Sequence, residues 1–294
     1  MKNVTISAKR YMDQFRFCLE DKLQPLKKLG VNIDVTEEYK GNMTFLGCSF
    51  RNTTLANLDY EKMAVSNIAE ALASYIVDVL EKPLIDKLIK STYSETSEKE
   101  QNMIYIKTLE LIRIRNHQHS RDIRLKKIMA EKLVDYFDKQ WQINIEGFVR
   151  FRLQEYMTDL TSVMEEAKEE VVVEKEYNDF IKLLRYFVDI QEPKVTYAHL
   201  MKKKGKYILI DSNDDIIAEE ACGDLNGCDA IISCLVTYAP EKIHVHIKDF
   251  YSDEEVLTTV NNIFDDRVVL CLGCNTCAEI KDNKISSLED TNKS

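Results

Sequence analysis

The stretch that decides the fold is Ile68–Leu80, which reads IAEALASYIVDVL. Its apolar side chains recur every three or four residues, and this spacing places them on one side of an α-helix. Glu70 and Asp78 interrupt the apolar run, so we expect a core helix and no membrane span. The apolar row consists of Ile68, Leu72, Tyr75, Ile76, Val79 and Leu80.

Helical periodicity continues outward from this stretch and predicts a helical domain over residues 56–192. Pro83 is expected to end or kink the first helix, and Pro193 marks the far boundary of the domain. The chain has only 8 Gly and 4 Pro, which disfavours a turn-rich all-β fold and favours long helices.

The two flanks of the helical domain have strand patterns. Residues 1–55 predict a small β-α-β-β piece, and residues 193–277 predict a unit of order β-β-β-α-β-α-β whose last three strands fit parallel crossover units. Residues 278–294 are polar and predict a disordered tail. The fold class is therefore α+β, with a predominantly helical body and a small C-terminal mixed α/β sheet unit.

Composition limits the classes of function. The formal net charge of -10 argues against a surface made for nucleic acid as a whole. The N-terminus has no apolar signal-peptide region, so we expect a cytoplasmic protein. The 8 cysteines of such a chain are reduced, and act as metal ligands, reactive thiols or small buried side chains.

The strongest local motif is a C-x₂-C-x₂-C triplet at the end of the last predicted strand. Such spacing brings thiolates together on zinc or on an iron–sulfur cluster, each of which needs a fourth ligand. If the strands at 216–218 and 267–272 are parallel, their C-terminal ends share one edge, and a cysteine after the first strand supplies that ligand. In the alternative interpretation, the first thiol is buried in the core and the others are free. The candidate ligands are Cys271, Cys274, Cys277, Cys222 and Cys228.

A second candidate metal pair is His244 and His246. Strand alternation places both imidazoles on one face of the predicted strand, with Val245 on the other. A half-exposed strand explains the same pattern without a metal.

Two basic segments are candidates for binding a partner. The segment 113–127, which contains Arg121 and Arg124, is suited to a phosphate backbone or an acidic protein, or is a solvated helical surface. In the segment 145–153, Phe148 combines with Arg150 and Arg152, whose planar guanidinium groups suit phosphate or carboxylate. In the structural alternative, the aromatic side chains are buried and the arginines pair with carboxylates.

The sequence contains none of the common catalytic motifs. Neither GxxxxGK[ST] nor GxGxxG occurs, and GxSxG and HExxH are also absent. No pair of acidic residues is distinguished by its spacing. The sequence therefore favours a protein that is not an enzyme.

Two motifs carry a resemblance to a known family. The segment IEGFVRFRL at 145–153 and the cysteine-bearing end RVVLCLGCNTC at 267–277 resemble those of YtxC-like sporulation proteins, in the same order. The resemblance extends from about Leu55 onward and implies a cytoplasmic role during spore formation, with no catalytic residue to transfer. We therefore expect a non-enzymatic scaffold that binds a protein partner and has a cysteine metal or redox site. The alternatives are a metal-dependent or redox enzyme that uses the cysteine triplet, and a nucleic-acid or regulator-binding module that uses residues 113–127.

Overall fold

The computed structural model divides the chain into two compact units, Met1–Val173 (unit 1) and Glu174–Ser294 (unit 2). Both units combine helices with a small mixed sheet, so the predicted α+β class with a predominantly helical body is confirmed. The boundary lies inside a long helix rather than near residue 192. The structure describes residues 3–52, 60–203, 206–213, 215–221, 225–246 and 254–271.

Unit 1 begins with a sheet of strand order β2-β3-β1-β4. Strand β4 pairs in parallel with β1, and helix α1 packs against α2, so the N-terminal piece belongs to the same unit as the helical region. Gly41 has a φ of 63° and permits the tight turn between β2 and β3. The elements are β1 (Asn3–Ala8), α1 (Met12–Lys28), β2 (Val31–Lys40), β3 (Met43–Asn52) and β4 (Gln142–Asn144).

The helices of unit 1 include the stretch that was expected to form the core. Ile68, Leu72 and Ile76 are buried, and Tyr75 packs edge-on against Phe15 with ring centroids 5.3 Å apart. The helices are α2 (Tyr60–Tyr75), a π-helix (Ile76–Leu80), α3 (Glu81–Thr92), α4 (Glu98–His119), α5 (Arg121–Phe137), α6 (Ile145–Arg152) and α7 (Gln154–Ile190), which continues into unit 2.

The helical stretch Tyr60–Thr92 is also long and apolar enough, by composition, to cross a membrane. Its most apolar window is 56% buried within the fold, which is the pattern of a core helix. Pro83 does not break the chain into separate helices. The π-helix ends three residues before it, and Pro83 lies in the first turn of α3, where its missing N–H is tolerated.

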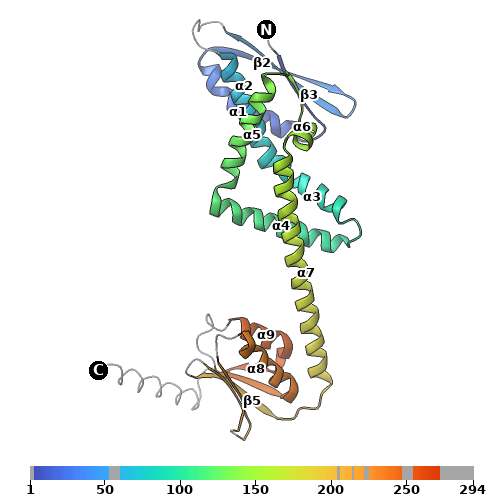
Figure 1. Ribbon diagram of the computed structural model, residues 1–294, viewed down its shortest axis with the longest axis vertical. Coiled ribbons are helices and arrows are strands. Elements are labelled where there is room, and N and C mark those ends of the chain that lie inside the picture. Colours follow the sequence, from blue (N-terminus) through green and yellow to red (C-terminus); the bar gives the residue numbers. More distant parts are fainter. Residues whose placement is uncertain are drawn as a thin grey trace, which may run out of the picture. The chain divides into compact units, whose positions relative to one another are not determined.

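Unit 2 is a five-stranded sheet of order β7-β6-β5-β8-β9. Strands β5, β8 and β9 are parallel neighbours, and β6 is antiparallel to both β5 and β7. Helix α8 connects β7 to β8, and helix α9 connects β8 to β9, so these two helices form the crossover connections (Figure 1). The elements are β5 (Tyr197–Lys203), β6 (Lys206–Asp211), β7 (Ile216–Ala221), α8 (Leu225–Tyr238), β8 (Lys242–His246), α9 (Glu254–Phe264), a 3₁₀ turn (Asp265–Arg267) and β9 (Val268–Leu270).

The core of unit 2 lies on one face of this sheet. Leu200 and Val245 contribute to it from neighbouring strands, together with Ile231 of α8, Val260 of α9 and Val188 of α7. Alternate residues of the strands point to the other face, where the histidines of β5 and β8 lie.

Candidate partner-binding site

The segment that contains Phe148 and Arg152 forms α6, and its start is fixed by a cap. The Asn144 side chain accepts a hydrogen bond from the Gly147 N–H at 2.8 Å. A Cβ at Gly147 would lie 3.0 Å from the Asn144 Oδ1, so this close approach favours glycine. Phe148 and Arg152 are four residues apart and therefore share one side of α6.

Phe148 is buried against helix α5. Its ring meets Tyr136 edge-on, with centroids 5.3 Å apart, and the Tyr136 hydroxyl donates to Gln140 at 2.8 Å and contacts the Gln142 carbonyl at 3.0 Å. These contacts hold the floor of a groove between α5 and α6. The groove is lined by Lys132, Asp135, Tyr136, Lys139, Gln140, Phe148 and Arg152.

A second, larger groove lies along the other part of α5, between α5, α2 and α1. Ser66 and Ser74 have short side chains on α2, so the surface there is lower than on the neighbouring helices. Ile123 contributes an apolar side chain that is 73% exposed. The groove has a volume of about 550 Å³, which is the size that several side chains of a partner fill. Its lining residues are Lys22, Ser66, Glu70, Ser74, Ile123, Lys126, Lys127, Ala130, Glu131, Val134 and Asp135.

Asp135 lines both grooves, so they adjoin along α5, and we call them together the α5 groove. Its walls carry six basic side chains and three acidic ones, a positive excess in a chain of net charge -10. Lys22, Lys126 and Lys132 form ion pairs with Glu70, Asp78 and Glu155.

The remaining three cations of the α5 groove are Lys127, Lys139 and Arg152. All three are exposed, and none of them has an ion pair within the part of the chain that the structure describes. They are therefore available to the carboxylates of a partner. The sequence identified Phe148 and Arg152 in one segment and placed Lys127 in another, and it missed Lys139. It could not show that they share one surface, because that surface is assembled from four helices, α1, α2, α5 and α6.

Arg121, in contrast, is buried at the start of α5. Its guanidinium group lies 3.1 Å from the Glu81 carboxylate and 3.0 Å from that of Asp159. The Tyr156 hydroxyl donates to the same Glu81 carboxylate at 3.0 Å. Two carboxylates therefore compensate a cation at a helix N-terminus, where the helix dipole disfavours positive charge.

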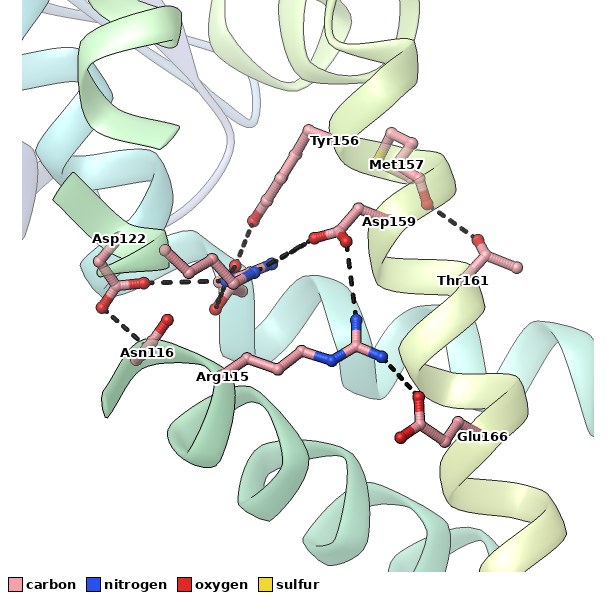
Figure 2. A network of polar contacts seen from close by, with 10 residues as sticks. Arg115, Asn116, Asp122, Tyr156, Met157, Asp159, Thr161 and Glu166 are labelled. Atoms are coloured by element: carbon pink, nitrogen blue, oxygen red, sulfur yellow. Dashed lines mark hydrogen bonds and ion pairs between the residues drawn. The ribbon is translucent and has the colours of Figure 1, made fainter. Parts of the chain in front are cut away.

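The network extends along α7 (Figure 2). Asp159 also faces Arg115, whose guanidinium group reaches Glu166, about two turns further along the helix. Asn116 donates to Asp122 at 3.0 Å. The arginines of the segment 113–127 that the structure places here thus bind the protein's own carboxylates.

Burial sets the electrostatics of this network. Loss of solvent raises the pKa of Glu81, and the Arg121 charge and the Tyr156 hydroxyl only partly offset that increase. Burial and the nearby Glu81 carboxylate also raise the pKa of Tyr156 far above its usual range. Burial leaves Arg121 no surface with which to reach a partner, so the partner-binding role predicted for it is better assigned to other residues. Arg124 is exposed but lies outside the α5 groove, and Arg150 packs over the exposed Phe151 ring at 5.5 Å.

The predicted cysteine site is only partly within the described residues. Cys222, Cys274 and Cys277 lie outside them, as does the side chain of Cys228 and the predicted tail 278–294. Cys271 is half-buried just after β9, and its N–H donates to the Val245 carbonyl at 3.0 Å. Among the described residues, no group of three or more His, Cys, Asp and Glu is arranged to hold a metal ion.

The strand order separates the two strands that were expected to bring a fourth cysteine ligand to the triplet. Strand β7, which precedes Cys222, and strand β9, which precedes the triplet, lie at opposite edges of the five-stranded sheet. Four strand spacings separate them, a distance of about 19 Å. The ends of these two strands are therefore not neighbours in the sheet. Because Cys222, Cys274 and Cys277 lie outside the described residues, the cysteine site itself stays a prediction.

The two histidines of β8 have a third imidazole beside them. His199 of β5 stacks on His244 with centroids 5.3 Å apart, and its Nδ1 lies 2.9 Å from the Nε2 of His246. Burial, followed by the two neighbouring imidazoles, lowers the pKa of His246. At least one nitrogen of the hydrogen-bonded pair must be unprotonated to accept the bond.

Taken together, the fold and the α5 groove define a two-unit α+β protein with a cationic surface groove and no recognisable catalytic constellation among the described residues. Comparison with known proteins gives the family. The model of the YtxC-like family matches residues 66–269, so the chain belongs to this family. It is 24% identical over 242 residues to the Uncharacterized protein YtxC of Bacillus subtilis (strain 168), a match that covers 71% of this chain and 78% of that protein. No solved structure matches the chain.

Proposed function

We propose that this protein is a non-enzymatic, cytoplasmic scaffold of the sporulation programme, and that its α5 groove binds an acidic, amphipathic helix of a protein partner. The observation that carries the proposal is the set of exposed cations, Lys127, Lys139 and Arg152, around an apolar floor. Family membership supports the sporulation role through the resemblance described above.

The shape and chemistry of the groove favour a helix as the ligand. Ile123, Ala130 and Val134 follow one side of α5 at helical spacing and provide apolar contacts along its length. An amphipathic helix buries apolar anchors in such a groove, while acidic residues at its borders meet the surrounding cations. Charge complementarity mainly increases the association rate and selects the partner, and the apolar contacts supply much of the affinity.

Nucleic acid fits this surface less well. Binding of single strands commonly uses exposed aromatic rings that stack on bases, but Phe148 is buried and the Tyr136 hydroxyl is already hydrogen-bonded within the protein.

The test uses a fluorescein-labelled model helix with Leu at positions i, i+3, i+4 and i+7 and Glu elsewhere. Fluorescence anisotropy at constant salt measures its affinity for the full chain. Arg152→Glu should weaken binding about tenfold, because a charge-assisted contact becomes a repulsive one. Arg124→Glu makes the same charge change on an exposed side chain of α5 outside the groove, and should leave the affinity within a factor of two.

Equal effects of the two variants would contradict the proposal, because binding would then depend on overall charge and not on the groove. Tighter binding of a labelled single-stranded oligonucleotide than of the model helix would instead favour the nucleic-acid alternative. Loss of heat-resistant spores after deletion of the gene in the source organism tests the sporulation role separately.

A second function, metal or redox chemistry at the C-terminal cysteines, remains a proposal. It is supported by the position of Cys271, whose backbone N–H forms a hydrogen bond with Val245 of β8, the strand that carries His244 and His246. Metal analysis and a visible spectrum of protein purified without oxygen or chelator test it. Stoichiometric zinc or iron that is lost in Cys274→Ser would support the site, and freely titratable thiols without metal would reject it.

A further inference from the structure

The part of α7 that belongs to unit 2 carries two apolar rows. The inner row faces the core of unit 2, where Ile181 and Val188 are buried and Leu184 is half-buried. The Tyr177 hydroxyl also lies 2.9 Å from the hydroxyl of Thr259 on α9. These contacts fix the helical conformation and the orientation of the helix on the unit.

The outer row consists of Phe180, Leu183, Phe187 and Ile190. Their spacing of three, four and three residues is that of the a and d positions of a heptad repeat. Each of these side chains is between 43% and 59% exposed, and Tyr186 beside them is 59% exposed. The row is thus a continuous apolar surface over three helical turns.

With both rows apolar, hydrophobic side chains occupy more than half of the circumference of the helix. The charged residues Lys182, Arg185 and Asp189 lie on the remaining side, where Arg185 pairs with Asp265 and Asp189 faces Arg267. Asp179 borders the outer row and pairs with Lys182. A helix with this distribution is normally covered on both apolar sides, whereas a surface helix has only one apolar stripe.

We infer that the outer row is the interface between two copies of this chain. A heptad seam requires a helical partner with the same repeat, and a second copy supplies an identical seam through a twofold axis. Five aromatic or aliphatic side chains, each about half exposed, offer about 500 Å² of mainly apolar surface. With the flanking polar atoms, this approaches the ~800 Å² per partner of a typical stable interface.

Two further features favour self-association over an interface for charged partners. The helix is already held by its inner row, so pairing does not require an additional folding step. The positions that border the seam include Tyr177, Leu184 and Tyr186, with Asp179 as the charged neighbour, so like charges do not oppose each other across most of it.

Sedimentation equilibrium of the full chain between 1 and 100 μM tests this inference. We expect a dimer for the natural sequence, and a dissociation constant at least about 30-fold higher for Leu183→Glu, because a charge would be buried at the centre of the seam. Phe187→Ala adds no charge and should weaken the dimer in the same direction. Phe17→Glu, a substitution of an α1 side chain that is 76% exposed, is the matched control and should remain dimeric.

A chain that is monomeric at 100 μM would overturn the inference, as would a Leu183→Glu variant that dimerises like the natural chain. Circular dichroism and thermal unfolding establish that each variant is folded, which is expected because the outer row makes no core contact. The dimer interface and the α5 groove are separate surfaces, so monomeric Leu183→Glu should bind the acidic model helix with unchanged affinity per chain.

Discussion

Two basic segments that look similar in the sequence have opposite environments in the structure. In the segment 113–127, Arg115 and Arg121 bind carboxylates within unit 1, and Arg121 is almost completely buried. In the segment 145–153, Arg152 is exposed beside Lys139 in a groove and has no ion pair among the described residues. The comparison teaches that a cluster of cations becomes a binding surface only where the fold does not supply carboxylates to match it.

The largest expected effect comes from removing the buried cation. Arg121→Met should lower the free energy of unfolding by about 3–5 kcal/mol, because Glu81 then remains buried without its counter-charge. Chemical denaturation measures the loss. Arg152→Met, the matched change in the groove, should alter stability by less than about 0.5 kcal/mol. Similar losses in both variants would show that the two arginines do not differ as described.

A smaller loss of stability is expected from a change at Glu81, the carboxylate partner of Arg121. Glu81→Gln should cost about 1–3 kcal/mol, since Arg121 keeps Asp159 and the amide oxygen still accepts a hydrogen bond from Tyr156. The folded-state pKa of Glu81 is raised above 4.5, so its carboxyl group contributes stability at low pH that is lost as pH rises through the folded-state pKa. The difference in stability between natural chain and variant should therefore be larger at pH 4 than at pH 7. A difference that grows with pH would reject this assignment.

The smallest loss of stability is expected from replacing His246 in unit 2, and its dependence on pH is opposite to that of Glu81. The pKa of His246 is lowered from 6.5, so its neutral imidazole contributes stability above pH 6.5 that is lost as pH falls through the lower folded-state pKa. The advantage of the natural chain over His246→Gln should shrink between pH 8 and pH 5. Denaturant unfolding at the two pH values measures it, and His117→Gln, on helix α4, is the control. An advantage that increases on acidification would contradict a buried, neutral His246.

Much of the fold could be predicted from local patterns, but the pairing of distant residues could not. The row Ile68, Leu72 and Ile76 is core, as its period indicated, and the α+β class followed from the strand-rich flanks. The carboxylates that bind Arg121 lie 40 and 38 residues away, at Glu81 and Asp159, and no local spacing reveals such a pairing.

The same reason explains what was missed or misplaced at the candidate sites. Strand order is decided by long-range packing, so the alternation around residues 216–218 could not show that β7 lies at the edge opposite to β9. The α5 groove combines Lys22, Lys127 and Lys139 from separate parts of the chain. In contrast, Phe148 and Arg152 share one short helix, and their proximity could be predicted from a spacing of four residues.

The most direct test of the central claim is to locate the bound acidic helix by hydrogen–deuterium exchange. The full chain is compared with and without a saturating concentration of the model helix. We predict slower exchange in peptides that cover residues 121–152, which contain α5 and α6. Little change is expected in peptides that cover the Arg115–Glu166 ion pair between α4 and α7, or the sheet of unit 2. Protection confined to unit 2, or no protection at saturation, would contradict the assignment of the α5 groove as the partner-binding site.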